Sequence, residues 1–187
     1  TAHPPRAWAL EGYGADFPVF LKASLPTLLP AAPPWLAGLA ALEWARVEAT
    51  LAPEVPPLAP DALAAVAPED LARLRLHLAP AVRQFDLDHA VPDRMPAGPV
   101  LVTRLRYEVQ ERPMDPTEAR LLSALRDLPL ASALEAVAAN DPGAAAAMAA
   151  NLGAWCQAWV QVGAVTAVSL DDAIVFEIAQ RTVTPAA

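Results

Sequence analysis

The sequence predicts an α+β fold that has an N-terminal helical region, a small antiparallel sheet and a C-terminal winged-helix-like unit. Three observations support this prediction. Apolar residues recur with a nearly period-two pattern over 100–109, as in a half-buried strand. Asp-Pro pairs at 115–116 and 141–142 are typical helix starts. Two β-rich runs, 164–168 and 173–178, follow the last predicted helix, and a short hairpin is their simplest interpretation.

Three helices are predicted between the strand and the hairpin. The first should cover 116–128, because Asp115 can accept from free backbone N–H groups and Glu118 completes a capping box. The second should cover 130–140, and the third should end at Gly163, a residue that suits a helix C-terminus. A strand, three helices and a terminal hairpin follow one another in a winged helix, a module that holds DNA or a peptide rather than performing chemistry.

The first half of the chain is predicted to add two helices, a further short helix that begins at 68–70, and two strands. The helices cover 16–23 and 34–51, and the longer one should be mostly buried because its apolar residues spread around much of its circumference. Leucines alternate with polar residues over 74–78, as in a half-buried strand, and 82–91 is a weaker second strand. With 100–109 these strands can form a three-stranded antiparallel sheet that joins the two halves.

Proline-rich segments divide the chain into two predicted regions. The 21 prolines gather mainly in three clusters, and the cluster at 92–99 marks the best boundary. We therefore expect a helical region with short strands over 1–95 and a winged-helix-like peptide-recognition region over 98–187. If the predicted sheet includes strands from both regions, the boundary marks a change in topology rather than two separate folding units.

The charge balance argues against nucleic acid as the partner. The chain carries 13 basic and 21 acidic residues, a formal net charge of -8, and Lys22 is its only lysine. Nonspecific affinity for nucleic acids comes mostly from Lys and Arg at phosphates, and no basic block is present. A peptide or protein is therefore the favoured partner of the winged-helix-like unit, and a winged-helix DNA-binding transcription regulator is the alternative.

Cytoplasm is the expected location. Cys156 is the only cysteine, which excludes an intrachain disulfide, and residues 1–6 lack the order of a secretion signal.

No charged residue occurs over 143–170, a stretch long enough to span a bilayer at roughly 20 residues per crossing. Asn151 and Gln157 within this stretch favour the other interpretation, a helix buried in a small core.

The sequence offers few groups for catalysis. A catalytic metal usually needs about three protein ligands. Besides carboxylates, the chain contains four candidate ligands: His3, His77, His89 and Cys156. The one local cluster is Asp86-Leu87-Asp88-His89, for which a polar strand edge or loop and a metal site are both open. No His or basic residue is near Cys156 in the sequence, which favours a small buried thiol over a nucleophile.

We therefore expect no enzymatic activity in the isolated chain. The alternative is a free-standing enzyme that uses Asp86, Asp88 or His89. The five tryptophans are most simply core residues at their helical spacings. Trp8 is an exception, because it lies in a proline-flanked segment and can be an interface anchor instead.

Two motifs in the first half resemble a bacterial protein family. The segment YGADFPVFL at 13–21 resembles the pattern Y-G-x-x-F-P-x-F-L, and PWLAGLAALEWA at 34–45 resembles P-x-L-x-x-L-A-x-L-E-W-A. The strand at 74–78 with Pro80 and the helix start at 115–119 also fit this family. Its members carry an older label of DNA-binding domain and are partner subunits of multinuclear non-haem iron-dependent oxidative enzymes.

This resemblance implies a partner and a division of labour. Members of the family are obligate partners of TIM-barrel iron enzymes that modify cysteines in ribosomally made peptides. The chain is then a noncatalytic subunit that binds such an enzyme and helps recognise the leader of the precursor peptide. The iron cofactor belongs to the partner enzyme, and none is expected in this chain. The short segment before Tyr13 resembles the compact methanobactin-biosynthesis branch.

The resemblance also points to candidate site residues. Leader recognition by addition of an extended strand to a sheet edge would use the strand at 100–109 and the third helix. In this strand Arg104 and Arg106 are either partners of acidic leader residues or ordinary solvent-facing residues. The candidate peptide-binding residues are Val102, Arg104, Arg106, Tyr107 and Glu108. The candidate contacts with the iron enzyme are Trp8, Tyr13, Phe17 and Phe20.

Overall fold

The structure is a computed structural model and describes residues 14–59, 61–63, 65–170 and 173–174. Its helices and antiparallel strands confirm the α+β class. In chain order the elements are α1 (Phe17–Leu28), α2 (Leu36–Leu51), the 3-10 helix η2 (Pro68–Arg73), β1 (Leu74–Leu78), β2 (Arg83–Leu87), β3 (Gly98–Leu105), β4 (Glu108–Pro113), α3 (Pro116–Ala124), α4 (Leu130–Asn140), α5 (Pro142–Gln161), β5 (Val165–Leu170) and β6 (Ala173–Ile174).

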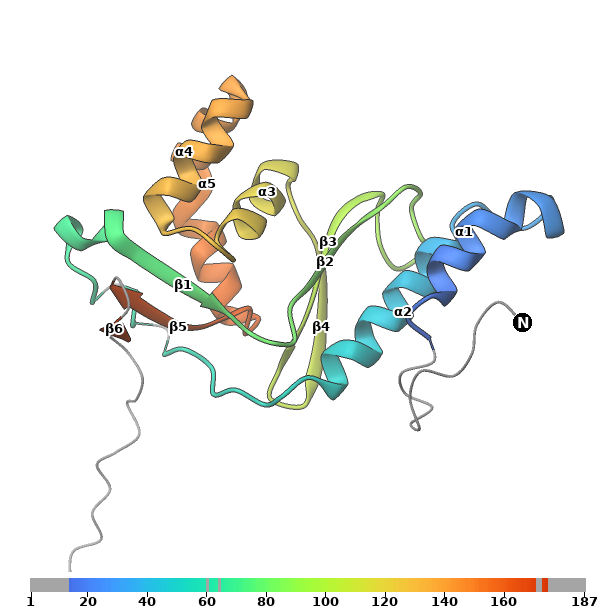
Figure 1. Ribbon diagram of the computed structural model, residues 1–187, viewed down its shortest axis with the longest axis horizontal. Helices are drawn as coiled ribbons and strands as arrows, with labels where there is room; N and C mark the ends of the chain where they lie inside the picture. The colour runs from blue at the N-terminus through green and yellow to red at the C-terminus, as the bar shows by residue number, and fades with distance from the viewer. Residues whose placement is uncertain (1–13, 60, 64, 171–172, 175–187) are drawn as a thin grey trace, which may run out of the picture.

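The strands form two antiparallel sheets of three strands each. One sheet has the order β1-β5-β6 and the other has the order β2-β3-β4. In the second sheet Arg83 is opposite Val102, and Val102 is opposite Glu111, so β3 is hydrogen-bonded on both sides. Figure 1 shows this sheet between α2 on one side and the α3–α5 helices on the other.

The prediction of one strand over 100–109 is wrong, because the chain reverses at Arg106-Tyr107. Leu105 at the end of β3 is opposite Glu108 at the start of β4, which leaves a two-residue turn between them. Arg106 has φ 50, a conformation that Asn and Gly adopt most readily. Neither residue type is present in this turn, so the usual hairpin signal is absent from the sequence.

The predicted sheet of 74–78, 82–91 and 100–109 is also wrong in one of its members. β1 leaves the other two strands and pairs with β5, where Leu76 is opposite Val168. Alternation of apolar residues identifies a half-buried strand but does not say which strand is its neighbour. The winged-helix-like unit is thus completed by β1, which ends at Leu78, before the predicted start of this unit at residue 98.

The two N-terminal helices differ from the predictions in length and burial. α1 continues past the predicted end at residue 23 to Leu28, despite Pro26 within it. α2 matches the prediction in extent, but it buries only one side, through Leu42, Ala45 and Ala49. The prediction that this helix is mostly buried is therefore wrong, although its inner side packs firmly on the sheet.

The helix starts of the second half follow the predicted signals, but the prediction that the first helix reaches residue 128 is wrong, because α3 ends at Ala124 and the chain forms a turn over 125–127. Asp115 accepts from the backbone N–H of Thr117 at 2.7 Å, and Asp141 accepts from that of Gly143 at 2.9 Å. Gly163 follows α5 with φ 71, as expected of a helix C-terminus. α5 is 20 residues long. In the part of the chain that the structure describes, no helix combines the length and the apolar character needed to cross a bilayer.

Glu118 does not take the capping-box role predicted for it. Its side chain turns inward and is paired with Arg112 of β4, and it accepts from the indole N–H of Trp159 at 2.8 Å. Glu118 is only 2% exposed. This buried group of three side chains connects β4, α3 and α5.

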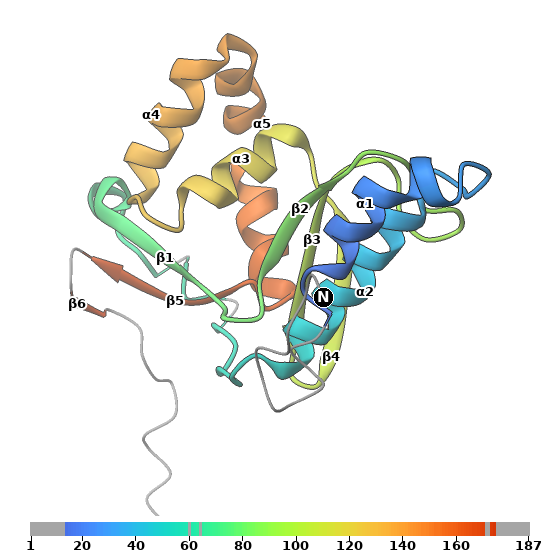
Figure 2. The same cartoon turned by 45° about the vertical axis from the view of Figure 1, so that its right-hand side comes forward.

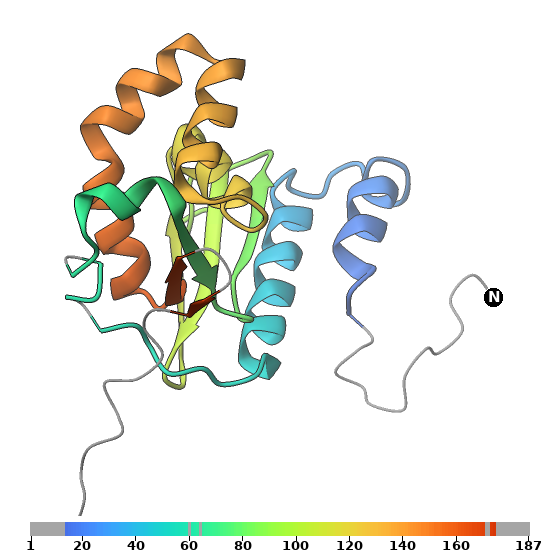
Figure 3. The same cartoon turned by 60° about the vertical axis from the view of Figure 1, so that its left-hand side comes forward.

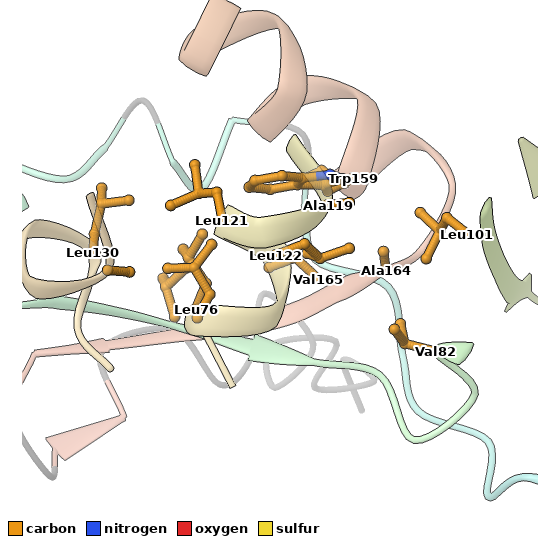
Figure 4. Packing of buried hydrophobic residues seen from close by; sticks show 14 of the residues in the cluster. Leu76, Val82, Leu101, Ala119, Leu121, Leu122, Leu130, Trp159, Ala164 and Val165 are labelled. Carbon is orange, nitrogen blue, oxygen red and sulfur yellow. The ribbon is translucent and has the colours of Figure 1, made fainter. Parts of the chain in front are cut away.

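Two hydrophobic cores lie on opposite faces of the β2-β3-β4 sheet. Figure 4 shows the first, where strand residues such as Leu76 and Val165 meet Leu121, Leu122 and Trp159 of the helices. The second core lies between α2 and the sheet and contains buried residues of α2, of β3 and of the segment after β2: Leu42, Ala45, Ala49, Val91, Met95, Val100 and Val102. Leu101 belongs to the first core, so β3 contributes to both.

Ion pairs also hold α2 against the β2-β3-β4 sheet. Arg46 pairs with Glu111 at 3.0 Å, and Arg83 pairs with Glu48 at 3.0 Å. Arg94 also pairs with Glu111 at 2.9 Å. Burial raises the pKa of Glu111, but hydrogen bonds and positive charge from Arg94 and Arg46 outweigh burial and hold this pKa below its ordinary value. The position of α2 over the sheet is therefore fixed by polar as well as apolar contacts.

Candidate functional site

The strand chosen from the sequence for peptide addition has no free edge. β3 is paired with β2 and β4, and Val102 at its centre is fully buried. Arg104 donates to the backbone oxygen of Ala52 and pairs with Glu54, both at 2.8 Å. Arg104 therefore holds the segment after α2 on the sheet, and β3 cannot receive a further strand.

The remaining predicted peptide-binding residues lie at the tip of the β3–β4 hairpin. Arg106, Tyr107 and Glu108 are all exposed there, and Tyr107 is 90% exposed. Nothing in the structure brings these side chains into a cavity. Their role in peptide binding stays a prediction.

The predicted contacts with the iron enzyme fall partly on α1. Trp8 and Tyr13 lie outside the described residues. Phe17 and Phe20 are on α1 and are 54% and 47% exposed. Figure 3 shows α1 standing outside α2, away from the rest of the described chain. Gly14, just before α1, lies against the ring of Trp44, so close that an added Cβ would be 2.3 Å from that ring. The two motifs of the family resemblance thus touch each other.

A free strand edge is present at β2 instead. Among the described residues β2 pairs with β3 alone, so alternate residues of β2 direct backbone N–H and C=O groups away from the sheet. Side chains of a strand alternate between the two faces. Phe85 belongs to the face that α2 covers, and Gln84 lines a cavity on the side of α3. Asp86 lines the cavities on both sides of the strand. Figure 2 shows β2 running between α2 and α3.

An apolar cavity adjoins β2 on the side of α1 and α2. We call it the α1 cavity; it has a volume of about 550 Å³. Its apolar lining includes Val19, Leu25, Leu29, Trp35 and Phe85. At its border Lys22 of α1 pairs with Asp88 at 2.6 Å, and this hydrogen bond lowers the pKa of Asp88. The cavity is thus closed on one side by a helix that an ion pair holds to the segment after β2.

A second cavity adjoins β2 on the side of α3 and α4. We call it the α3 cavity; it has a volume of about 740 Å³, and its lining includes Gln84, Asp86 and Arg120. Gln84 donates from Nε2 to the backbone oxygen of Ala119 at 2.5 Å. The Oε1 atom of Gln84 is buried and has no hydrogen-bond partner among the described residues. Arg120 is paired with Asp141 at 2.8 Å.

The cluster Asp86-Leu87-Asp88-His89 forms a polar strand edge and the segment after it. Asp86 is on β2, and Asp88 is held by Lys22. Within the described ranges, His, Cys, Asp and Glu side chains do not gather in groups of three that would hold a metal ion. Burial raises the pKa of Cys156 to about 11, which keeps its thiol protonated at neutral pH.

A strand edge with a cavity on each face is suited to binding an extended peptide. The backbone of such a peptide can pair with the edge, while its successive side chains enter the two cavities in turn. The sequence left a polar strand edge or loop and a metal site open for the cluster that contains Asp86, and it did not reveal the cavities. They are assembled from residues far apart in the chain, such as Gln84 with Arg120, and no local pattern marks them.

Comparisons with known proteins found no relative of this chain. The chain matches no protein-family model, no curated protein and no solved structure. Its function must therefore be argued from this site and from the two N-terminal motifs.

Proposed function

We propose that the chain is a noncatalytic partner subunit that binds an extended peptide at the free edge of β2. In this proposal it acts in the cytoplasm with a multinuclear iron-dependent oxidative enzyme and helps recognise the leader of a ribosomally made precursor peptide, in the methanobactin-type modification of cysteine. Iron and oxygen chemistry belong to the partner enzyme. The motifs at 13–21 and 34–45 support this choice of partner.

The observation that carries the proposal is the free edge of β2 between two cavities. Backbone pairing gives affinity without regard to sequence, whereas pockets for alternate side chains give specificity. β4, the other edge of the same sheet, carries charged and amide side chains of the kind that discourages pairing. Glu108 is exposed, and Gln110, Glu111 and Arg112 are half-buried. β1, an edge strand of the other sheet, is in contact with α4.

α1 supports the proposed contact with the iron enzyme. It exposes Phe17, Val19 and Phe20, three large apolar side chains within four residues of sequence, and exposed groups of apolar side chains often mark an interaction site. The same helix lines the α1 cavity next to β2. A partner that covers α1 would therefore lie close to a peptide bound at β2, which would bring the peptide to the iron enzyme.

The alternative of a DNA-binding regulator receives no support from the charges of the winged-helix-like unit. Residues 127–180, which include α4, α5 and β5, contain no lysine, arginine or histidine. A recognition helix normally contacts phosphates and bases through such side chains. α5 would present mainly alanine side chains to the major groove of DNA.

Co-expression with candidate multinuclear iron enzymes of the same genome tests the proposal. We expect one of them to co-purify with the tagged chain in a stable complex that contains iron. We also expect that enzyme to modify its precursor peptide at least tenfold more slowly when this chain is omitted. Replacement of Phe17 and Phe20 by Ser should weaken the complex, whereas replacement of exposed Tyr107 by Ser should leave it intact. Failure to form any complex, together with equal modification without this chain, would refute the proposal.

A further inference from the structure

We propose that α1 undocks and unfolds on its own while the rest of the chain stays folded, and that this opening controls access to the α1 cavity. Two contacts hold the helix in its docked position: Gly14 lies against the ring of Trp44, and Lys22 pairs with Asp88. This inference goes beyond the proposed function, because it concerns the conformation of the chain alone and depends on neither an iron enzyme nor a peptide.

The first argument comes from the shallow packing of α1. None of its residues is buried, and four of its apolar side chains are between 47% and 70% exposed: Phe17, Val19, Phe20 and Leu28. α2, by contrast, buries three residues in the core that it shares with the sheet. Packing stabilises an element roughly in proportion to the apolar area that it removes from water. α1 is therefore attached more weakly than α2.

The second argument comes from the space under α1. Val19 and Leu25 of α1 line the α1 cavity of about 550 Å³, and so do Trp35 and Phe85 from other parts of the chain. Atoms that line a cavity lack some of the dispersion contacts that a close-packed core provides. The contact of α1 with the rest of the chain is therefore incomplete, and α1 can leave without disrupting either hydrophobic core.

The third argument comes from the length of α1. The helix has 12 residues, and isolated helices shorter than about 12–15 residues are marginal in water. Pro26 inside the helix has no N–H to donate, so one helical hydrogen bond is missing. Once α1 leaves α2 it should therefore lose its helical structure. The connection to α2 does not oppose this, because its backbone hydrogen bonds, such as Ala32 N–H to the oxygen of Leu29 at 2.8 Å, are local.

The two contacts that hold α1 should differ in strength. A Cβ added at Gly14 would be 2.3 Å from the ring of Trp44, so only glycine fits this position without a shift. Lys22 and Asp88 are 2.6 Å apart, but their side chains are 68% and 56% exposed. Exposed ion pairs contribute little to stability because water and salt screen them. We therefore expect the contact at Gly14 to matter more than the ion pair.

Opening of α1 changes the surface that the chain presents. Trp35, Trp44 and Phe85 are half-buried in the docked state. Departure of α1 would uncover the side of Trp44 that Gly14 contacts and the walls of the α1 cavity at Trp35 and Phe85. A molecule that binds this apolar wall would bind only the open fraction of the chain, and its apparent affinity would fall by that fraction. α1 thus acts as a lid of the cavity.

Cleavage by a lysine-specific endoproteinase tests this inference on the full chain. Lys22 is the only lysine of the sequence and lies in α1, so cleavage reports on this helix alone. When opening and closing are fast, the cleavage rate follows the population of the open state. We expect cleavage after Lys22 under conditions where circular dichroism shows the rest of the chain folded. Urea should accelerate it less steeply than it promotes global unfolding, because local opening exposes less surface.

Three substitutions make the test specific. Gly14→Ala should raise the cleavage rate at least tenfold, because the added Cβ displaces α1 from Trp44, and should leave the midpoint of global unfolding unchanged. Asp88→Asn should raise the rate about two- to threefold, as expected for loss of an exposed ion pair. Gly153→Ala on α5 is the matched control, since its added Cβ meets nothing within 4 Å and should not change the rate.

Two results would overturn the inference. If cleavage after Lys22 depends on urea as steeply as global unfolding does, α1 opens only together with the whole chain. If neither Gly14→Ala nor Asp88→Asn accelerates cleavage, these contacts do not hold the helix. Asp88→Asn changes an exposed side chain, so it remains measurable if Gly14→Ala does not fold.

Discussion

Glu118→Ala is expected to lower the free energy of unfolding by about 3–5 kcal/mol, the range found when one partner of a buried ion pair is removed. Glu118 is buried, pairs with Arg112 and accepts from the indole N–H of Trp159 at 2.8 Å. In the variant the indole N–H of Trp159, which is 0% exposed, would stay buried without this acceptor. The half-buried guanidinium of Arg112 would keep its bond to the backbone oxygen of Pro113 at 3.3 Å, but its Nε atom has no partner among the described residues.

Urea denaturation followed by circular dichroism measures this loss. Glu118→Gln should lose less, because an amide oxygen can still accept from Trp159, and it remains measurable if the alanine variant does not fold. Glu108→Ala is the control, since this carboxylate is exposed at the hairpin tip and its removal should change the free energy by less than about 0.5 kcal/mol. A loss below about 1 kcal/mol for Glu118→Ala would contradict the structural role of the buried group.

Leu42→Ala is expected to lower the free energy of unfolding by about 2–5 kcal/mol, because it leaves a cavity in the core between α2 and the sheet. Leu42 is 0% exposed and belongs to the same core as Val100 and Val102 of β3. β3 also contributes Leu101 to the core of the winged-helix-like unit. We therefore expect both cores to unfold in one transition, shifted as a whole by the substitution.

Thermal unfolding monitored by tryptophan fluorescence and by circular dichroism measures this cooperativity. Leu51→Ala on the same helix is the matched control; Leu51 is 55% exposed, and its replacement should cost less than about 1 kcal/mol. Two separate transitions, only one of which moves in Leu42→Ala, would show that the two cores are independent. The division into regions 1–95 and 98–187 would then be physical as well as topological.

The starts of α3 and α5 and the end of α5 could be predicted because their signals are local. Asp115 and Asp141 accept from the next free N–H groups, and Gly163 adopts the positive φ that favours glycine at a helix end. The β3–β4 hairpin could not be predicted, because Arg106 takes a positive φ without the residue types that usually mark such a turn. Strand partners were missed for a different reason: β1 pairs with β5 across more than eighty residues of sequence, and periodicity carries no information on that pairing.

The candidate site, like the strand pairing, depends on contacts between residues that are far apart in the sequence. The polar cluster around Asp86 was visible in the sequence as a strand edge. Its neighbours in the α3 cavity come from α3 and α4 and become neighbours only when the chain folds. A continuous strand over 100–109 predicts that Arg104 either meets a leader peptide or faces solvent; in the structure it donates to the segment after α2 instead.

Amide hydrogen exchange of the chain in complex with its iron enzyme, with and without the precursor peptide, tests most directly where the peptide binds. If the peptide adds to the free edge, the amides of β2 (Arg83–Leu87) should become at least tenfold slower to exchange when it is present. The amides of β4 should keep their rates. Protection of β4 with no change in β2, or no change in either strand while the enzyme still modifies the peptide, would contradict the account.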